Sequence, residues 1–388
     1  MFKAKTGYST NANAEKAGCE AAKMLKDELS NISVVYAYAS CMYDLDEMLG
    51  GIATLLPDVP VIGNTSFTGV IVPEGFITGE QGFLGVMGLS DPDMSVGVAS
   101  MEKNKCAVAD GESVARKAMH SAGKICPPDY FYMVASPGEE EYYLKGITNV
   151  IGRVPFFGGS AADNSIAGQW KLYTDNGAFS DGVAVAFFYS DKKIYNTFTG
   201  AYRETKDVGV ITKVDGDRTL VEIDGRPAME VYSDWRNINS STLMGGNLLA
   251  ETIVSPLGVK DRLGDLVAIR HPMNGNADGS MAMGNKVTEA TAIIRMEATV
   301  DELVSSVDDT LRELKHKMTS PGAYHLVHCG GRRAGIGERI NEVTERIQKE
   351  AGDIPFIVEF TFGEYGYEAD GLNTCGGLML SFSGFEAK

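Results

Sequence analysis

Three segments combine glycines with compact polar or charged side chains, a composition typical of ligand-binding turns. The first, 158–164, reads Gly-Gly-Ser-Ala-Ala-Asp-Asn. Its glycines allow a backbone to approach a ligand closely, and Ser160, Asp163 and Asn164 can hold an ammonium or hydroxyl group. It is no nucleophile elbow, because Ala162 stands where that motif requires glycine. A tight turn with Asx capping would have the same composition.

The second segment, 328–337, reads His-Cys-Gly-Gly-Arg-Arg-Ala-Gly-Ile-Gly and is expected to be a loop joining a strand to a helix. Its glycines and the following helix N-terminus predict an anion cradle, in which Arg332 could clamp a carboxylate bidentately. It matches neither a P-loop nor G-x-G-x-x-G, because position 340 is Ile. A turn with solvated arginines is the alternative. In another alternative, Cys329 is the nucleophile of a hydrolase or transferase, its thiolate stabilised by Arg332.

The third segment, 362–366, reads Phe-Gly-Glu-Tyr-Gly and is followed by Asn373 within Leu-Asn-Thr-Cys. Glu364 could oppose the arginine charge or receive a substrate amine. A plain hairpin with an exposed glutamate would have the same composition.

Histidine spacing gives little support for a metal site. His325 and His328 lie on one expected strand and would point to opposite faces of it. His120, His271 and His316 lie among polar residues and are expected to face solvent. We therefore predict no protein-ligated metal.

An internal repeat is expected to position the three segments. Val59–Ser66 resembles Val154–Ser160, and Ile354–Ile357 is a weaker third match. Each is preceded by a helical stretch, an apolar strand and a second helical stretch, and then begins with a proline-led strand. Proline suits the first residue of a strand because it lacks one ladder donor.

Residues from about 207 to 297 have no copy; they read as strand-rich, with one helix starting near Pro227. We predict an α+β fold with mixed sheets, built from repeated helix-strand-helix-strand units in two domains. The N-terminal domain would be 1–205, with units of about 1–100 and 101–205. The C-terminal domain, 206–388, would hold the strand-rich extension and the third unit.

Composition restricts partners and location. The chain has 35 Lys and Arg against 52 Asp and Glu, a net charge of −17, which argues against nucleic acid or an anionic membrane surface as partner. The N-terminus lacks a signal-peptide apolar region, and no run approaches a membrane span. Six cysteines without a CxxC pair suit a reducing compartment. The sequence predicts a cytoplasmic protein.

The order of the motifs resembles the FIST proteins, in which a FIST N-terminal domain precedes a FIST C-terminal domain. The resemblance is carried by Thr6–Ser9, Val61–Gly69, Gly158–Asp163, Val221–Ala228, Cys329–Arg332, Gly363-Glu364 and Asn373-Thr374. The sequence departs from the family where Asn64 replaces the usual Cys and Gly69-Val70 the usual Gly-Glu. The resemblance implies an intracellular sensory module that binds a small ligand, with an amino acid the usual suggestion.

Because almost no residues are left for an output domain, a sensor of this kind is expected to act through a separate signalling protein. Some members of the family are described as haem-binding gas sensors. Haem would need an axial ligand such as His328 or Cys329 in an apolar pocket. The sequence shows no such pocket, so no cofactor is expected; a haem sensor stays an alternative, as does a protein-interaction scaffold.

We therefore expect a ligand in a cleft between the two domains. Arg332 would hold an α-carboxylate while Asp163 or Glu364 receives the ammonium, and domain closure would be the signal. The candidate ligand-binding residues are Asn64, Thr65, Ser66, Gly158, Gly159, Ser160, Asp163, Asn164, Cys329, Gly330, Arg332, Glu364 and Asn373.

Overall fold

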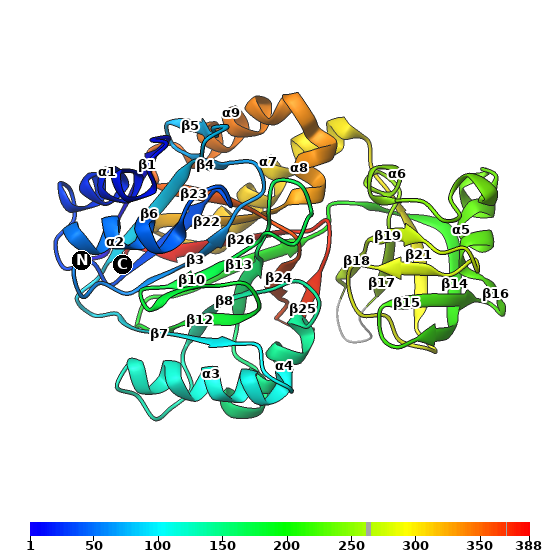
Figure 1. The fold of residues 1–388 in the computed structure, drawn as a ribbon, viewed down its shortest axis with the longest axis horizontal. Helices are drawn as coiled ribbons and strands as arrows, with labels where there is room; N and C mark the ends of the chain where they lie inside the picture. Colours follow the sequence, from blue (N-terminus) through cyan, green and yellow to red (C-terminus); the bar gives the residue numbers. More distant parts are fainter. Residues whose placement is uncertain (261–264, 370) are drawn as a thin grey trace.

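The computed structural model describes residues 1–260, 265–369 and 371–388. A large lobe carries the repeats, and a small strand-rich lobe, residues 203–297, lies beside it (Figure 1). The predicted α+β fold with mixed sheets and repeated units is confirmed. Within the described ranges, no helix has both the length and the apolar character needed to cross a membrane.

Each repeat in the large lobe has the order strand, helix, strand, helix, strand, hairpin, strand, and unit 3 adds the short helix α8 (Gly330–Ile336). Unit 1 comprises β1 (Lys3–Ser9), α1 (Ala14–Lys26), β2 (Val34–Ala39), α2 (Leu45–Leu55), β3 (Val61–Thr65), the hairpin β4 (Val70–Val72) and β5 (Gly75–Ile77), and β6 (Leu84–Ser90). Unit 2 comprises β7 (Ser95–Glu102), α3 (Ala107–Ser121), β8 (Tyr130–Ala135), α4 (Glu140–Ile151), β9 (Phe156–Ser160), the hairpin β10 (Leu172–Thr174) and β11 (Gly177–Phe179), and β12 (Gly182–Tyr189).

Unit 3 is interrupted by the small lobe. It begins with β13 (Ile194–Thr199) and resumes with α7 (Val300–Lys317), β22 (Pro321–Cys329), α8 (Gly330–Ile336), α9 (Ile340–Ala351), β23 (Phe356–Thr361), the hairpin β24 (Glu364–Tyr367) and β25 (Asn373–Gly376), and β26 (Leu380–Glu386). The boundary predicted at 205 falls within the first strand of the small lobe, so residues 206–388 contribute to both lobes.

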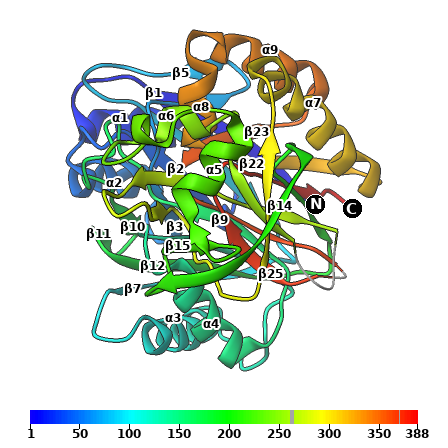
Figure 2. The ribbon, with the colours of Figure 1, turned by 90° about the vertical axis from the view of Figure 1, so that its right-hand side faces the viewer.

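The small lobe is a mainly antiparallel sheet with two short helices. Its elements are β14 (Arg203–Asp215), β15 (Thr219–Ile223), β16 (Arg226–Pro227), α5 (Ala228–Arg236), α6 (Leu249–Thr252), β17 (Leu257–Lys260), β18 (Val267–Arg270), β19 (Pro272–Gly275), β20 (Met281–Met283) and β21 (Ala292–Glu297). The helix expected near Pro227 is α5. In Figure 2 the molecule is turned so that the small lobe faces the viewer, and β14 lies in front of the large lobe.

The three sheets of the large lobe exchange hairpins in a closed cycle. Their strand orders are β1-β6-β2-β3-β10-β11, β7-β12-β8-β9-β24-β25 and β13-β26-β22-β23-β4-β5. Each unit's hairpin therefore completes the sheet of another unit, and the three units surround a pseudo-threefold axis. Inner faces from all three sheets form one central core, which includes Tyr36, Tyr132 and Ile357. Local periodicity could not show this exchange, because the hairpins are short and their partners distant in sequence.

Candidate functional site

The loops that follow β3, β9 and β23 are linked into a ring. The three links are backbone hydrogen bonds of Phe67 N to Phe360 O (2.9 Å), Ala162 N to Thr65 O (2.9 Å) and Phe362 N to Ser160 O (3.0 Å). Each link joins one unit to another at the carboxyl end of a parallel strand. Ligands commonly bind at such strand ends. The first and third predicted segments, and the segment around Asn64, therefore meet at one end of the axis.

Ser160 ends β9 and is fully buried. Its Oγ donates to Glu140 Oε1 (3.0 Å) and lies 2.7 Å from Tyr365 Oη. Strand β24 pairs with β9 so that Glu364 lies opposite Gly159 and Tyr365 opposite Gly158. The predicted residues Gly158, Gly159, Ser160 and Glu364 are thus neighbours.

Glu364 is fully buried, so the exposed-hairpin alternative does not hold. Its carboxyl group accepts hydrogen bonds from Thr361 Oγ1 (2.9 Å) and Met379 N (2.8 Å). Burial raises the pKa of Glu364 to about 8, although these two hydrogen bonds oppose the shift. At neutral pH this side chain is mainly a protonated acid that can donate a hydrogen bond.

Cys329 ends β22 and is buried, with its Sγ accepting from Gly331 N (3.2 Å). Burial, and secondarily Glu364, raise the pKa of the Cys329 thiol. The enzyme alternative requires a stabilised thiolate, which this environment disfavours.

Arg332 lies in helix α8, because residues 330–336 form a helix and not the expected loop. Its guanidinium is fully buried and not solvated: it donates to Gly200 O (2.7 Å), Leu303 O (3.3 Å) and Ser306 Oγ (2.5 Å). It also lies over the Tyr202 ring, 5.6 Å from the centroid. Since Gly200 and Tyr202 belong to the connection between β13 and β14, Arg332 anchors the link between the lobes.

The remaining predicted side chains mostly bond to nearby backbone. Asp163 accepts from the backbone N–H groups of Ser165, Ala167 and Gln169. Further bonds are those of Thr68 N to Asn164 Oδ1 (3.0 Å), Lys171 N to Thr65 Oγ1 (2.9 Å), Phe360 N to Ser66 Oγ (2.9 Å), Asn64 Nδ2 to Thr65 O (3.1 Å) and Asn373 Nδ2 to Val154 O (2.8 Å). Gly330 is the first residue of α8. Asp163 therefore organises its own loop in this structure.

Sequence reasoning missed the ion pair that connects the lobes. Arg218 lies in the turn between β14 and β15, and its Nη2 contacts Glu140 Oε2 (2.6 Å) and Glu141 Oε2 (2.5 Å) at the start of α4. Burial raises the pKa of Glu140, although Arg218 opposes the shift. The acidic start of α4 is visible in the sequence, but no local pattern links it to Arg218.

The Arg218→Gln substitution is expected to lower the free energy of unfolding by about 2–4 kcal/mol, because Glu140 would lose its cation while still buried. Urea denaturation measures this. Arg226→Gln is the matched control: its pair with Asp234 is exposed, and it should change stability by less than about 0.5 kcal/mol. Equal losses in the two variants would contradict the prediction.

His325 and His328 point to opposite faces of β22, as strand alternation predicts. His325 faces the axis, whereas His328 packs on the other side of β22, 5.3 Å from the Phe360 ring. The expectation that His271 faces solvent is wrong. It is buried near Gly331, and burial lowers its pKa to about 4. In the described part of the chain, no three His, Cys, Asp or Glu side chains are grouped so as to hold a metal ion.

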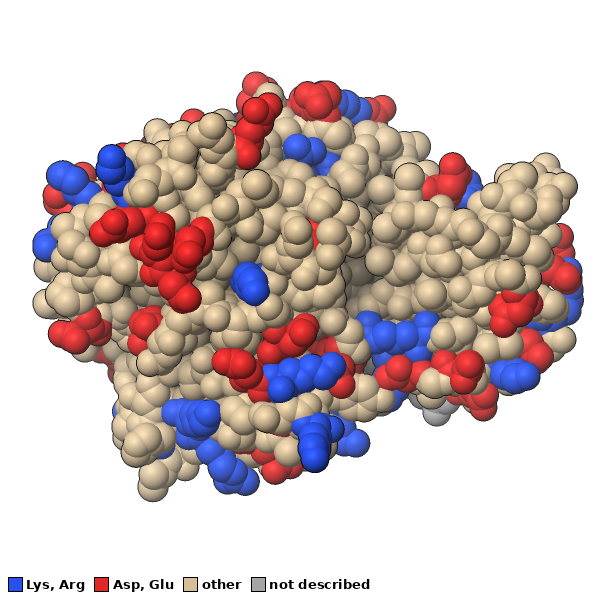
Figure 3. All heavy atoms as spheres, viewed as in Figure 1, with Lys and Arg blue, Asp and Glu red and all other residues tan. Residues whose placement is uncertain are grey.

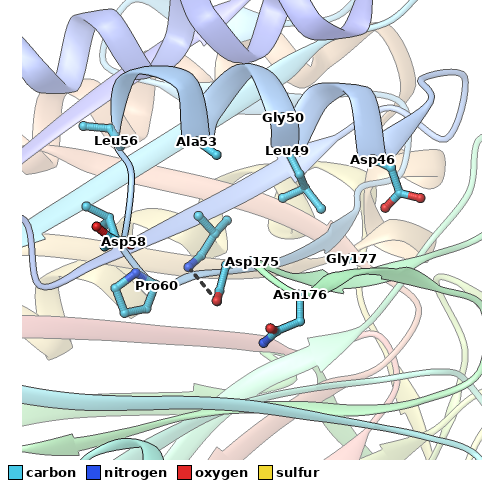
Figure 4. A pocket seen from close by; sticks show the side chains of 12 residues that line it. Asp46, Leu49, Gly50, Ala53, Leu56, Asp58, Pro60, Asp175, Asn176 and Gly177 are labelled. Atoms are coloured by element: carbon cyan, nitrogen blue, oxygen red, sulfur yellow. Dashed lines mark hydrogen bonds between the residues drawn. The ribbon is translucent and has the colours of Figure 1, made fainter.

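A surface pocket of about 490 Å³ lies between α2 and the turn of the β10–β11 hairpin (Figure 4). It carries Asp46, Asp58 and Asp175. Two of these carboxylates are used by backbone groups: Asp46 accepts from Ala178 N (3.1 Å), and Asp175 from Val61 N (3.3 Å). The pocket lies at the opposite end of β3 from the loop ring and includes none of the predicted residues.

The small lobe contacts the large lobe where α6 meets α8 and where β18 meets β25, and the surface is hollowed along the junction of the lobes (Figure 3). The fold and this junction define a two-lobed α+β protein with a buried polar layer between its lobes. The chain belongs to the FIST family: the FIST N domain matches residues 33–226 and the FIST C domain residues 228–367. FIST domains are generally regarded as small-ligand-binding sensory domains.

No curated protein matches the sequence. Among solved structures, cyanuric acid hydrolase from A. caulinodans is similar at a TM-score of 0.37 and 10% identity, covering 100% of both chains. Phosphoribosylformylglycinamidine synthase II from Thermotoga maritima is similar at a TM-score of 0.22 and 10% identity, covering 99% of this chain and 72% of that one. Both TM-scores are too low to support an inference about fold or function.

Proposed function

We propose that this protein binds an amino acid, or a similar small metabolite, at the junction of its lobes, and that the resulting change in lobe orientation is transmitted to a separate signalling protein in the cytoplasm. The observation that carries the proposal is a continuous hydrogen-bonded chain from Tyr365 through Ser160 and Glu140 to Arg218. This chain starts beside the loop ring and ends in the small lobe, so a ligand that engages Ser160 acts directly on an interlobe contact.

The chemistry of this chain suits a zwitterion. Arg218 has an unpartnered Nε in addition to the group that binds the two glutamates, so it can bind an α-carboxylate without leaving the junction. Glu140 and Glu141 are then placed to receive the ammonium group. Ser160 and the protonated Glu364 supply neutral hydrogen-bonding groups. In this assignment Arg218 takes the role first expected of Arg332.

The buried positions of these groups favour binding coupled to lobe movement. Ser160 and Glu364 are fully buried, and Glu140 is 1% exposed. A ligand reaches them only when the small lobe moves away, and it binds productively when the lobe returns. The anchored connection at Gly200 and Tyr202 is a natural pivot. All six cysteines are free thiols, which supports the cytoplasmic assignment.

Isothermal titration against the twenty amino acids tests the proposal. We expect one amino acid to bind saturably, and Ser160→Ala to weaken that binding about tenfold through loss of a buried hydrogen bond. Ser121→Ala is the control, since Ser121 lies exposed at the end of α3. Binding by none of the twenty would overturn the ligand class. If Ser160→Ala and Ser121→Ala bound the amino acid with equal affinity, the assignment of Ser160 to the binding site would be overturned.

A further inference from the structure

A pocket of about 360 Å³ lies beside the two connections through which the chain passes between the lobes. Arg203, the first residue of β14, lines it where the chain enters the small lobe. Thr299, the N-cap residue of α7, lines it where the chain returns to the large lobe. The pocket includes no residue of the hydrogen-bonded chain that runs from Tyr365 to Arg218, so it is a separate site.

Three arginines from three elements of the small lobe line this pocket: Arg203 from β14, Arg236 from α5 and Arg295 from β21. Among the described residues that line it, Glu297 alone is acidic. This concentration of guanidinium groups runs against the net charge of the chain, −17. Arg203 is paired with Glu302 (3.1 Å). Arg236 and Arg295 therefore remain as the groups that would bind an anion.

Both of these guanidinium groups keep donors for a ligand. Nε of Arg295 donates to Asp207 (2.7 Å), but its terminal amino groups donate no hydrogen bond to a described residue, and Nη1 lies 3.7 Å from the carboxylate of Glu297. Nη2 of Arg236 lies 3.7 Å from the carboxylate of Glu251, whose side chain is 61% exposed. Long ion pairs to exposed carboxylates contribute little to stability, so an incoming anion can replace them.

A buried hydroxyl group in the pocket also lacks a partner. Ser255 lines the pocket and is 7% exposed, and its Oγ forms no hydrogen bond with any described residue. Its carbonyl oxygen accepts from Tyr232 Oη (2.7 Å), which holds the backbone in place. A buried hydroxyl group without a partner is costly, and a ligand oxygen would remove that cost. This observation points to a ligand independently of the arginines.

We propose that this pocket binds a small organic phosphate. A phosphate monoester presents three terminal oxygens and up to two negative charges, and a guanidinium group can bind two such oxygens in parallel. Arg236 and Arg295 would hold the phosphate group, and the hydroxyl group of Ser255 would donate to it. Trp235 and Val254 also line the pocket and supply an apolar surface for the organic part of the ligand. The inference is independent of the amino acid proposed at the lobe junction.

The fluorescence of Trp235 tests this site in the full-length chain. The sequence has two tryptophans, so Trp170→Phe leaves Trp235 as the single reporter. AMP and ribose 5-phosphate should change its fluorescence saturably at millimolar concentration or below, and more tightly than inorganic phosphate. Adenosine and ribose, which lack the phosphate group, should have no effect.

Three results of these titrations would contradict the proposal. No response to any of the phosphate compounds would overturn the site. Succinate binding more tightly than every phosphate compound would overturn the ligand class in favour of a dicarboxylate. Inorganic phosphate binding as tightly as both esters would overturn the role given to the organic part of the ligand.

Variants in the Trp170→Phe chain test the individual groups. Arg236→Gln should weaken phosphate-ester binding about tenfold or more, and Ser255→Ala severalfold. Arg226→Gln is the control for the first, because Arg226 is exposed on the same lobe outside the pocket. Ser233→Ala is the control for the second, because the Ser233 hydroxyl is also buried without a partner but does not line the pocket.

Both control variants should bind with the affinity of the Trp170→Phe chain. Circular dichroism of each variant shows whether it has folded. Unchanged affinity in folded Arg236→Gln would overturn the site, and equal affinity in Ser255→Ala and Ser233→Ala would overturn the assignment of Ser255 to it.

Discussion

Gly158→Ala is expected to prevent the protein from accumulating in a folded, soluble form. Gly158 lies in β9 with φ +144°, and an added Cβ would lie 1.8 Å from Met133 O on the neighbouring strand β8. No side-chain rotation relieves a clash with backbone, so the strands would have to separate. We expect a loss of more than about 4 kcal/mol, measured as soluble yield and urea midpoint.

Gly50→Ala is the control for this substitution. Gly50 lies in α2, and an added Cβ there has no heavy atom within 4 Å. Alanine should therefore stabilise the protein by about 0.5–1 kcal/mol, since it is the better helix former. The repeat supplies a second instance of the clash: a Cβ at Gly63 in β3 would lie 1.7 Å from Ala37 O. A Gly158→Ala protein with an unchanged urea midpoint would show that β9 does not lie as described.

Glu364→Gln is expected to change how stability depends on pH. The folded-state pKa of Glu364, about 8, is above its ordinary value of 4.5. Its contribution to stability is therefore fully present below about pH 4.5 and is lost as pH rises to about 8. At about 1.4 kcal/mol per pH unit, this amounts to several kcal/mol, on the order of 5. Glutamine stays neutral, so the variant should not lose this stability.

Urea unfolding of both proteins between pH 5 and pH 8 measures the effect. The stability of Glu364→Gln relative to the natural chain should rise by about 3–5 kcal/mol over this range. The other buried acid, Glu140, is present in both proteins, so its contribution cancels. Glu345→Gln, an exposed position on α9, should parallel the natural chain. If the stability of Glu364→Gln had the same pH dependence as that of the natural chain, Glu364 would be ionised throughout this pH range. Its side chain would then not be buried as in this structure.

Sequence patterns predicted the elements that depend on neighbouring residues. The apolar spacing of Ala17, Ala21 and Leu25 marks the buried face of α1, and the proline-led strands recur because each unit needs the same strand start. The same reasoning failed for His271, which has polar neighbours in the chain but is buried against the large lobe. Exposure depends on what packs over a residue, and sequence neighbours do not report it.

The sequence by itself determined the repeated units, the strand-rich character of 207–297 and the position of Ser160 and Glu364 beside glycines, because these follow from local periodicity and residue order. Only the tertiary structure decided which hairpin completes which sheet, that Arg218 meets Glu140 across the lobes, and that Tyr38, Tyr132 and His325, one from each unit, meet in the central core. Each of these depends on contacts between residues far apart in the chain, and such contacts exist only once the units have closed around the axis.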